Sequence, residues 1–353
     1  MKATIKDVAK EAGVSTGTVD RVINNKGNVA KKTEKKVLEA IEKLNYTKSP
    51  IAKALVSRRK HIKIGVVFPH LEHYFWQEVF KGIEEVREKL EPFGVEIIVE
   101  TTKTYSIEEH IKAVDKLVKK EVNGIAMISY DDIRCRESID KLVEKNIQVA
   151  TFISDSPKSR RLIFNGEDSI KAGNIAGKLM GLYLKGKGNI LIVGVHKILS
   201  CMQDRIEGFK NLIDNEFEDI QIIEIIENKE LVNGEEDEYR TIIENIIKEV
   251  IEKKDGIDGI YVTNSFTGSV GNLLKKYNYE KEIVLVGHEN TDEIRDLIRK
   301  NIVKATVYQN QKEEIIRSIE ILYEKITDNK KVYANVQYID LGILIKEKLA
   351  KNI

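Results

Sequence analysis

MKATIKDVAKEAGVSTGTVDRVIN, residues 1–24, has the pattern of two short helices joined by a tight turn. Thr4 is a suitable N-cap residue, and Asp7 stands three positions later, as in a capping box. Gly13 can adopt the left-handed conformation that ends a helix, and Ser15 can cap the next helix. In a helix-turn-helix, the N-terminal part of the second helix enters the major groove of DNA. The pattern therefore predicts a DNA-binding head.

Two further segments continue this pattern. Apolar residues recur at helical spacing between residues 32 and 45 and predict a third helix that closes a small core. TKSPIAKALVSRRK, residues 47–60, has a Ser-Pro pair typical of a helix start, followed by a short apolar run. A helix this short is unstable alone in water, so it needs a partner helix or DNA to form. We expect a DNA-binding domain over residues 1–46 and a hinge helix and linker over 47–60.

Charge is divided unevenly along the chain. Residues 1–61 hold 15 Lys and Arg against 6 Asp and Glu, whereas the remainder holds 43 against 51. A basic head on an acidic body is typical of a phosphate-binding module attached to a sensing domain. The alternative is a solvated lysine-rich face, but the basic excess coincides with the helix-turn-helix pattern.

Composition limits the class of protein further. The two cysteines, Cys135 and Cys201, are far apart, which argues against a disulfide framework or a cysteine-based zinc site. No apolar run approaches the ~18 residues of a membrane span. The first residues lack the pattern of a signal peptide, so we expect a cytoplasmic protein without a membrane partner.

Beyond residue 61, short apolar runs alternate with helical stretches. The runs cover 62–68, 95–102, 124–129, 148–154, 189–195, 220–227, 259–264, 283–289 and 304–310. The helical stretches include 106–121, 169–184, 236–254 and 311–326. This alternation predicts an α/β fold with parallel sheets covered on both faces. The number of units exceeds one doubly wound sheet, so we expect two lobes, with ligands at the carboxyl ends of the strands.

Three segments resemble one known family. TIKDVAKEAGVSTGTVDRVIN, KTEKKVLEAIEKLNY and SPIAKAL, at these spacings, resemble the lac repressor family of bacterial transcription regulators. The resemblance implies a periplasmic-binding-protein-like effector and dimerisation domain over residues 61–353. Its lobes would comprise 61–154 with 310–335, and 155–309 with 336–353. It also implies a homodimer or larger homo-oligomer, double-stranded operator DNA as a partner, and a sugar-like effector.

The resemblance assigns DNA contacts residue by residue. Arg21 could pair with guanine through two hydrogen bonds, worth roughly 1–3 kcal/mol of discrimination, or contact a phosphate. Gly17 has no side chain to read a base, and Asp20 replaces the common serine and could accept from cytosine or orient Arg21. Leu55 matches the wedge that opens a base step in the minor groove, or it packs within a hinge dimer. The expected DNA contacts are Thr4, Ser15, Thr16, Gly17, Thr18, Asp20, Arg21, Asn24, Ala52 and Leu55.

An effector site between the lobes follows from the same resemblance. Aromatic faces pack against the CH faces of sugar rings, although one or two of the aromatic residues at 74–76 could instead pack in the core. Arg205, in QDRIEGF, matches an arginine that binds sugar hydroxyls, and Glu289 stands where the family usually has aspartate. The expected effector contacts are Tyr74, Phe75, Trp76, Asp131, Asp155, Arg205, Asn264, Glu289 and Gln309. This set of side chains suits a polyhydroxylated neutral ligand.

Other functions are less well supported. His70 and His73 have a metal-ligand spacing, but no carboxylate or cysteine partners cluster nearby in sequence, so we expect no metal and no cofactor. The sequence lacks a nucleophile elbow, a Walker loop and a dinucleotide glycine fingerprint, which argues against a metabolite-processing enzyme. A nucleobase or phosphorylated effector stays open as an alternative. The sequence therefore predicts a regulator, with repression as the favoured mode, whose operator affinity a small effector controls.

Overall fold

The structure is a computed structural model of the 353-residue chain. It describes residues 3–23, 27–44, 46, 61–69, 74–194, 198–226, 241, 244–245, 247–249 and 256–349. The expected hinge helix at 47–60 lies outside the described residues, as does most of the helix expected at 236–254. Within the described part of the chain, no helix is long and apolar enough to cross a membrane.

The head forms three short helices: α1 (Ile5–Ala12), α2 (Thr16–Ile23) and α3 (Lys31–Lys43). The predicted capping box is confirmed, because Asp7 N donates to Thr4 Oγ1 at 3.3 Å and Thr4 N donates to the Asp7 carboxylate at 2.8 Å. Gly13 ends α1 with φ of 65°, as the sequence predicts. The core of the head contains the fully buried Val8, Val19 and Val37, one from each helix. The helix-turn-helix therefore folds around its own small core.

The first lobe contains a six-stranded parallel sheet in the order β11-β5-β4-β3-β1-β2. Its strands are β1 (Lys63–Pro69), β2 (Glu96–Thr102), β3 (Gly124–Met127), β4 (Gln148–Phe152), β5 (Ile163–Gly166) and β11 (Val336–Tyr338). Its helices are α5 (Tyr74–Leu90), α6 (Ile107–Lys119), α7 (Ile133–Glu144) and α13 (Gln311–Asp328), and a 3-10 turn, η1 (Glu91–Phe93), follows α5. Buried residues of α5 and α13 pack on one face of the sheet, and those of α6 and α7 pack on the other.

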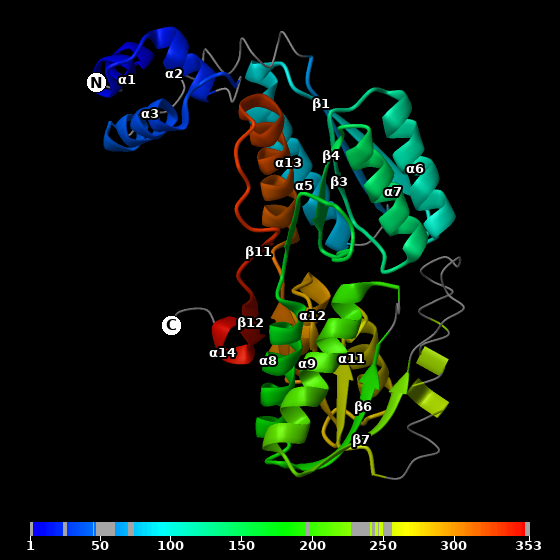
Figure 1. The fold of residues 1–353 in the computed structure, drawn as a ribbon. Helices are drawn as coiled ribbons and strands as arrows, with labels where there is room; N and C mark the ends of the chain where they lie inside the picture. The colour runs from blue at the N-terminus through cyan, green and yellow to red at the C-terminus, as the bar shows by residue number, and fades with distance from the viewer. Residues whose placement is uncertain are drawn as a thin grey trace.

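The second lobe repeats this plan with the order β12-β10-β9-β8-β6-β7, in which β12 runs antiparallel to β10. Its strands are β6 (Lys187–Val193), β7 (Asp219–Ile226), β8 (Gly259–Val262), β9 (Val284–His288), β10 (Val303–Tyr308) and β12 (Gly342–Ile345). Its helices are α8 (Ser169–Tyr183), α9 (Ser200–Glu216), α11 (Thr267–Lys276), α12 (Asp292–Arg299) and α14 (Lys346–Leu349). Figure 1 shows the two lobes stacked end to end, with α13 beside α5 in one lobe and α8 beside α9 in the other.

The chain passes between the lobes at points that differ partly from those expected. The described residues cross after β5, after β10 and after β11. The boundaries predicted at residues 154–155 and 335–336 are therefore too early, because β5 and β11 pair with each other in the first sheet. β5 has the sequence IFNG, in which only two apolar residues precede Asn165 and Gly166, so it does not form a recognisable apolar run.

Candidate DNA and effector sites

The first turn of α2 presents the predicted DNA-reading positions. Thr16, Gly17 and Arg21 are exposed on the head. Ser15 Oγ accepts a hydrogen bond from Thr18 N at 3.1 Å and lies 2.9 Å from Thr18 Oγ1, so these two hydroxyls cap the helix. Thr4 is engaged in its own capping box. Of the positions predicted to read bases, Thr16 in the first turn of α2 and Arg21 in its last turn carry exposed side chains.

Asp20 packs against the rest of the head, whereas Gly17 has free space around it. Asp20 is half-buried, and burial together with the nearby Asp20 charge raises the pKa of Tyr46. Asp20 therefore lies on the side of α2 that faces the end of α3. At Gly17, an added Cβ would meet only Ser15 Oγ, at an ordinary 3.7 Å. Within the described residues, nothing in the head requires glycine at this position.

Several predicted contacts cannot be placed. Asn24, Ala52 and Leu55 lie outside the described residues, as do His70 and His73. Tyr74 begins α5, but its side chain is not among those described.

Arg205 occupies the centre of the second lobe's carboxyl edge. It projects from α9 and is 1% exposed. Its Nε donates to Glu167 Oε1 at 2.6 Å, its Nη1 donates to the Thr263 carbonyl at 2.5 Å, and its Nη2 lies 3.7 Å from Glu289 Oε1. An added Cβ on Gly173 of α8 would lie 2.1 Å from the Arg205 carbonyl oxygen. Because Gly173 has no side chain, α8 and α9 can pack closely. This close packing positions Arg205 beside Glu167.

Glu289 and Gln309 follow the ends of β9 and β10 and join this network. Gln309 Nε2 donates to Glu289 Oε1 at 3.3 Å, and both residues are buried. Burial raises the pKa of Glu289 to about 7, and the Arg205 charge only partly offsets the effect. The structure therefore brings three of the predicted effector contacts, Arg205, Glu289 and Gln309, into one cluster.

Strained backbone marks the corresponding point in each lobe. Ile153 directly follows β4 with φ of 64°, and Glu289 directly follows β9 with φ of 78°. A left-handed conformation is unfavourable for a β-branched residue and costs about 1–3 kcal/mol. Such strain clusters at ligand sites, where the surrounding structure holds the backbone in place.

Two buried acidic residues of this cluster were not predicted from the sequence. Glu167 follows β5 and is 1% exposed, and Glu314, in the first turn of α13, is 0% exposed. Neither carboxyl oxygen of Glu314 has a side-chain hydrogen-bond partner, although the backbone N–H of Ile153 lies close enough to stabilise the ionised form slightly, and Glu167 Oε2 has no hydrogen-bond partner. Burial, followed by repulsion from Glu167 and Glu289, raises the pKa of Glu314 well above its usual range. The sequence spacing could have indicated the burial of Glu314. Glu314 shares one helix face with the buried Ser318 and Leu322, since positions i, i+4 and i+8 lie on the same face.

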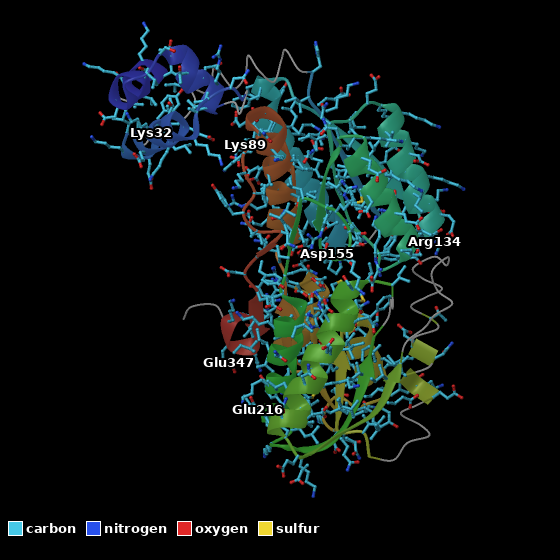
Figure 2. The ribbon with its side chains drawn as sticks, viewed as in Figure 1. Lys32, Lys89, Arg134, Asp155, Glu216 and Glu347 are labelled. Atoms are coloured by element: carbon cyan, nitrogen blue, oxygen red, sulfur yellow. The ribbon has the colours of Figure 1, made fainter. Side chains whose placement is uncertain are left out.

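The remaining predicted contacts have different surroundings. Asp155 lies at the junction of the lobes (Figure 2), where both its oxygens pair with Arg161 and Thr151 Oγ1 donates to it at 2.6 Å. Asp131 is exposed and pairs with Arg136 at 2.7 Å. These side chains already have protein partners, so Asp155 has little capacity left for a ligand.

The aromatic residues divide between core and cavity. Trp76 is 4% exposed and packs against Phe68 and Phe75, with ring centroids 5.8 and 4.8 Å away, as expected of a core residue. Phe75 is half-buried and lines a cavity of about 530 Å³ together with Glu289 and Gln309. Trp76 thus fits the alternative of core packing.

A second cavity, of about 320 Å³, lies on the opposite side of the network. Its lining includes Asp131, Asp155, Glu167 and Asp204. Asn264, the last predicted contact, is buried, and its Oδ1 accepts from Phe266 N at 3.1 Å. The Arg205 network therefore separates two cavities, because Glu289 and Gln309 line one and Glu167 lines the other.

Comparison with known proteins agrees with this architecture. The model of the bacterial regulatory proteins of the lacI family matches residues 4–49, and the periplasmic binding protein domain matches residues 64–331. The chain belongs to the lacI family. This lacI-family chain is 30% identical to the transcriptional regulator pepR1 of Lactobacillus delbrueckii subsp. lactis, over 76% of its own length and 74% of the relative's.

Two other similarities support the assignment at different levels. The chain is 32% identical to the transcriptional regulator DegA of Bacillus subtilis, but the match spans only 61% of the length of each protein. The structure of GanP, a glucose-galactose binding protein from Geobacillus stearothermophilus, superposes with a TM-score of 0.72. That superposition covers 82% of this chain and 99% of GanP at 23% sequence identity, which establishes the two-lobed fold of the lacI-family chain.

Proposed function

We propose that the protein is a DNA-binding transcriptional repressor whose operator affinity is controlled by a small polyhydroxylated effector bound between the two lobes. The observation that carries this proposal is the buried Arg205 network, which leaves polar atoms without partners at the junction of the lobes. Buried polar groups are normally satisfied, so a cluster of unsatisfied ones between two cavities indicates a ligand. The exposed first turn of α2 supplies the surface that meets DNA.

Each site has its own residues in this proposal. Thr16 and Arg21 read bases, and the chain near Gly17 approaches the DNA backbone. Arg205, Glu289, Gln309 and Asn264 bind effector hydroxyls, and Phe75 packs against the apolar face of the ligand. Asp131 and Asp155 lie in the second cavity as positioning residues, since both already form ion pairs. The protein performs no catalysis and acts as a cytoplasmic homodimer.

The effector site can be coupled to the DNA-binding site because the side chains of the Arg205 network come from both lobes. Glu314 belongs to α13 of the first lobe, whereas Arg205 and Glu289 belong to the second. A ligand that contacts all three holds the lobes at a fixed angle and so fixes the segments that cross between them. Such coupling is typically worth ~1–3 kcal/mol.

The experiment that tests this function begins with selection of an operator from random double-stranded DNA by the full-length protein. Fluorescence anisotropy then measures the affinity for that operator at several salt concentrations. We expect a specific site with two half-sites and a steep loss of affinity with salt, because phosphate contacts release counterions. Enrichment of no sequence would contradict the proposal.

A further inference from the structure

Among the residues that the structure describes, the interlobe network holds more carboxyl groups than basic side chains. Three buried carboxyl groups, those of Glu167, Glu289 and Glu314, face the single guanidinium of Arg205. Arg205 pairs closely with Glu167, while its contact with Glu289 is longer, at 3.7 Å. No side chain donates a hydrogen bond to Glu314, and the nearby backbone N–H of Ile153 only partly offsets the burial of this carboxyl group. A buried carboxyl group without a cation beside it keeps its proton, so full ionisation of these carboxyl groups requires a positive charge from elsewhere.

The neighbouring basic groups within the described residues do not supply that charge, and His196 and Lys197 lie outside the described residues. Arg161 gives both of its parallel hydrogen bonds to Asp155. His288, adjacent to Glu289, is held neutral because burial lowers its pKa well below the usual range, and its Nε2 lies 2.8 Å from the Tyr261 hydroxyl. Asp204 adds a further acid, whose pKa burial and nearby carboxylates raise to about 6.

The unsatisfied atoms are mostly acceptors. Glu167 Oε2, both Glu314 oxygens and Gln309 Oε1 are buried without side-chain partners, against the donor Arg205 Nη2 and the ring nitrogen His288 Nδ1, whose role depends on the tautomer. A hydroxyl group donates one hydrogen bond, whereas an ammonium group donates three and carries a positive charge. The site therefore has acceptors for a cation and one donor for a hydroxyl or carbonyl oxygen.

A metal ion does not fit this pattern. Among the residues that the structure describes, no three histidine, cysteine or acidic side chains converge closely enough to hold one.

We propose that the effector carries a protonated amine in addition to its hydroxyl groups, and that Glu314 and the free oxygen of Glu167 bind this amine while Arg205 and Gln309 bind hydroxyls. This inference rests on the proposed function and narrows its ligand from neutral polyols to amino-polyols. Glu314 is the decisive residue, because it lies on α13 and would place the positive charge of the ligand against the first lobe.

The test uses matched pairs of ligands that differ in one group. Full-length protein is titrated by calorimetry with glucose and glucosamine, galactose and galactosamine, and sorbitol and glucamine, with each N-acetylated amine as a neutral control of similar size. We expect at least one amine to bind about tenfold or more tightly than its hydroxyl partner and its acetylated form, as a charge-assisted hydrogen bond implies. Equal or tighter binding of the neutral members would overturn the inference, as would the absence of binding by every amine.

Two variants separate recognition from folding. Glu314→Gln keeps the shape of the side chain but cannot ionise beside a bound amine, so we expect it to abolish the preference for the amine. Glu313→Gln alters the adjacent half-buried carboxylate, which pairs with Arg317 at 2.7 Å, and should preserve the preference. A preference that survives in Glu314→Gln would contradict the assignment.

The same samples distinguish failure of this inference from failure of the proposed function. Operator affinity is measured with each ligand that binds. If a neutral sugar binds and changes operator affinity, the inference of an amine is wrong but the proposed repressor function stands. If the protein binds no operator, the proposed function itself is wrong.

Discussion

Arg205 and Glu167 form an ion pair of 2.6 Å in which both side chains are almost completely buried at the junction of the lobes. Removing one partner of a buried pair leaves an uncompensated charge and costs about 3–5 kcal/mol, whereas an exposed pair contributes about 1 kcal/mol or less. This relationship makes the proposed effector site also a determinant of the stability of the second lobe.

Arg205→Ala should therefore lower the free energy of unfolding by several kcal/mol. Adding Glu167→Gln should recover part of that loss, because the neutral amide no longer needs a cation. Urea denaturation of the three proteins measures the effect. Arg160→Ala, which breaks the exposed pair with Glu144, is the matched control and should change stability little. Similar losses in Arg160→Ala and Arg205→Ala would show that the buried pair has no special role.

Glu314→Gln should stabilise the protein increasingly as pH rises. Burial raises the folded-state pKa of Glu314 well above 4.5, so the folded protein retains a proton that the unfolded chain has lost. Wild-type stability therefore falls as pH rises from about 4.5 through the folded-state pKa, and glutamine removes this loss. Thermal unfolding at a series of pH values between 4 and 8 should show no difference at the acid end and a growing advantage for the variant. Glu313→Gln should show no such trend, and a constant difference for Glu314→Gln would argue against a raised pKa.

Gly17→Ala separates the stability of the head from its affinity for DNA. Alanine is favoured over glycine inside a helix by about 1 kcal/mol, and the added Cβ has room at this position. We expect thermal unfolding of the head to occur at a higher temperature in the variant. Operator affinity should fall if DNA approaches the backbone at Gly17, and an unchanged or higher affinity would place the DNA elsewhere.

Arg21→Ala tests the base-reading role of the exposed arginine on α2. Loss of a bidentate contact to guanine should cost about 1–3 kcal/mol and relax specificity at a single base pair. Competition binding with operators changed one base pair at a time measures this directly. A uniform loss across all of these operators would instead identify a phosphate contact, and Arg160→Ala in the body should leave binding unchanged.

Much of the fold could be predicted because its signals are local. The capping box of Thr4 and Asp7 and the turn at Gly13 are set by neighbouring residues, and the nine apolar runs are all strands in the structure. β5, β11 and β12 are short strands, and their pairing depends on partners far away in the sequence. For that reason the crossing points between the lobes were predicted only approximately.

The candidate site was predictable only in part for a related physical reason. Arg205 and Glu289 could be found from the motifs around them. Glu167 and Glu314 have charged neighbours in the sequence, a pattern typical of a solvent-exposed surface. Only the tertiary fold buries the two side chains beside one another. Conversely, Trp76 reads as a ligand-facing aromatic residue, but the core of the first lobe encloses it.

The most direct test of the central claim, that effector binding and DNA binding are coupled, is reciprocal calorimetry on the full-length protein. The affinity for an identified effector is measured with and without saturating operator, and the affinity for operator is measured with and without saturating effector. Linkage requires the two ratios to be equal, and we predict a change of roughly 5- to 150-fold in each. Identical effector affinities with and without operator would show that the two sites act independently and would contradict the account.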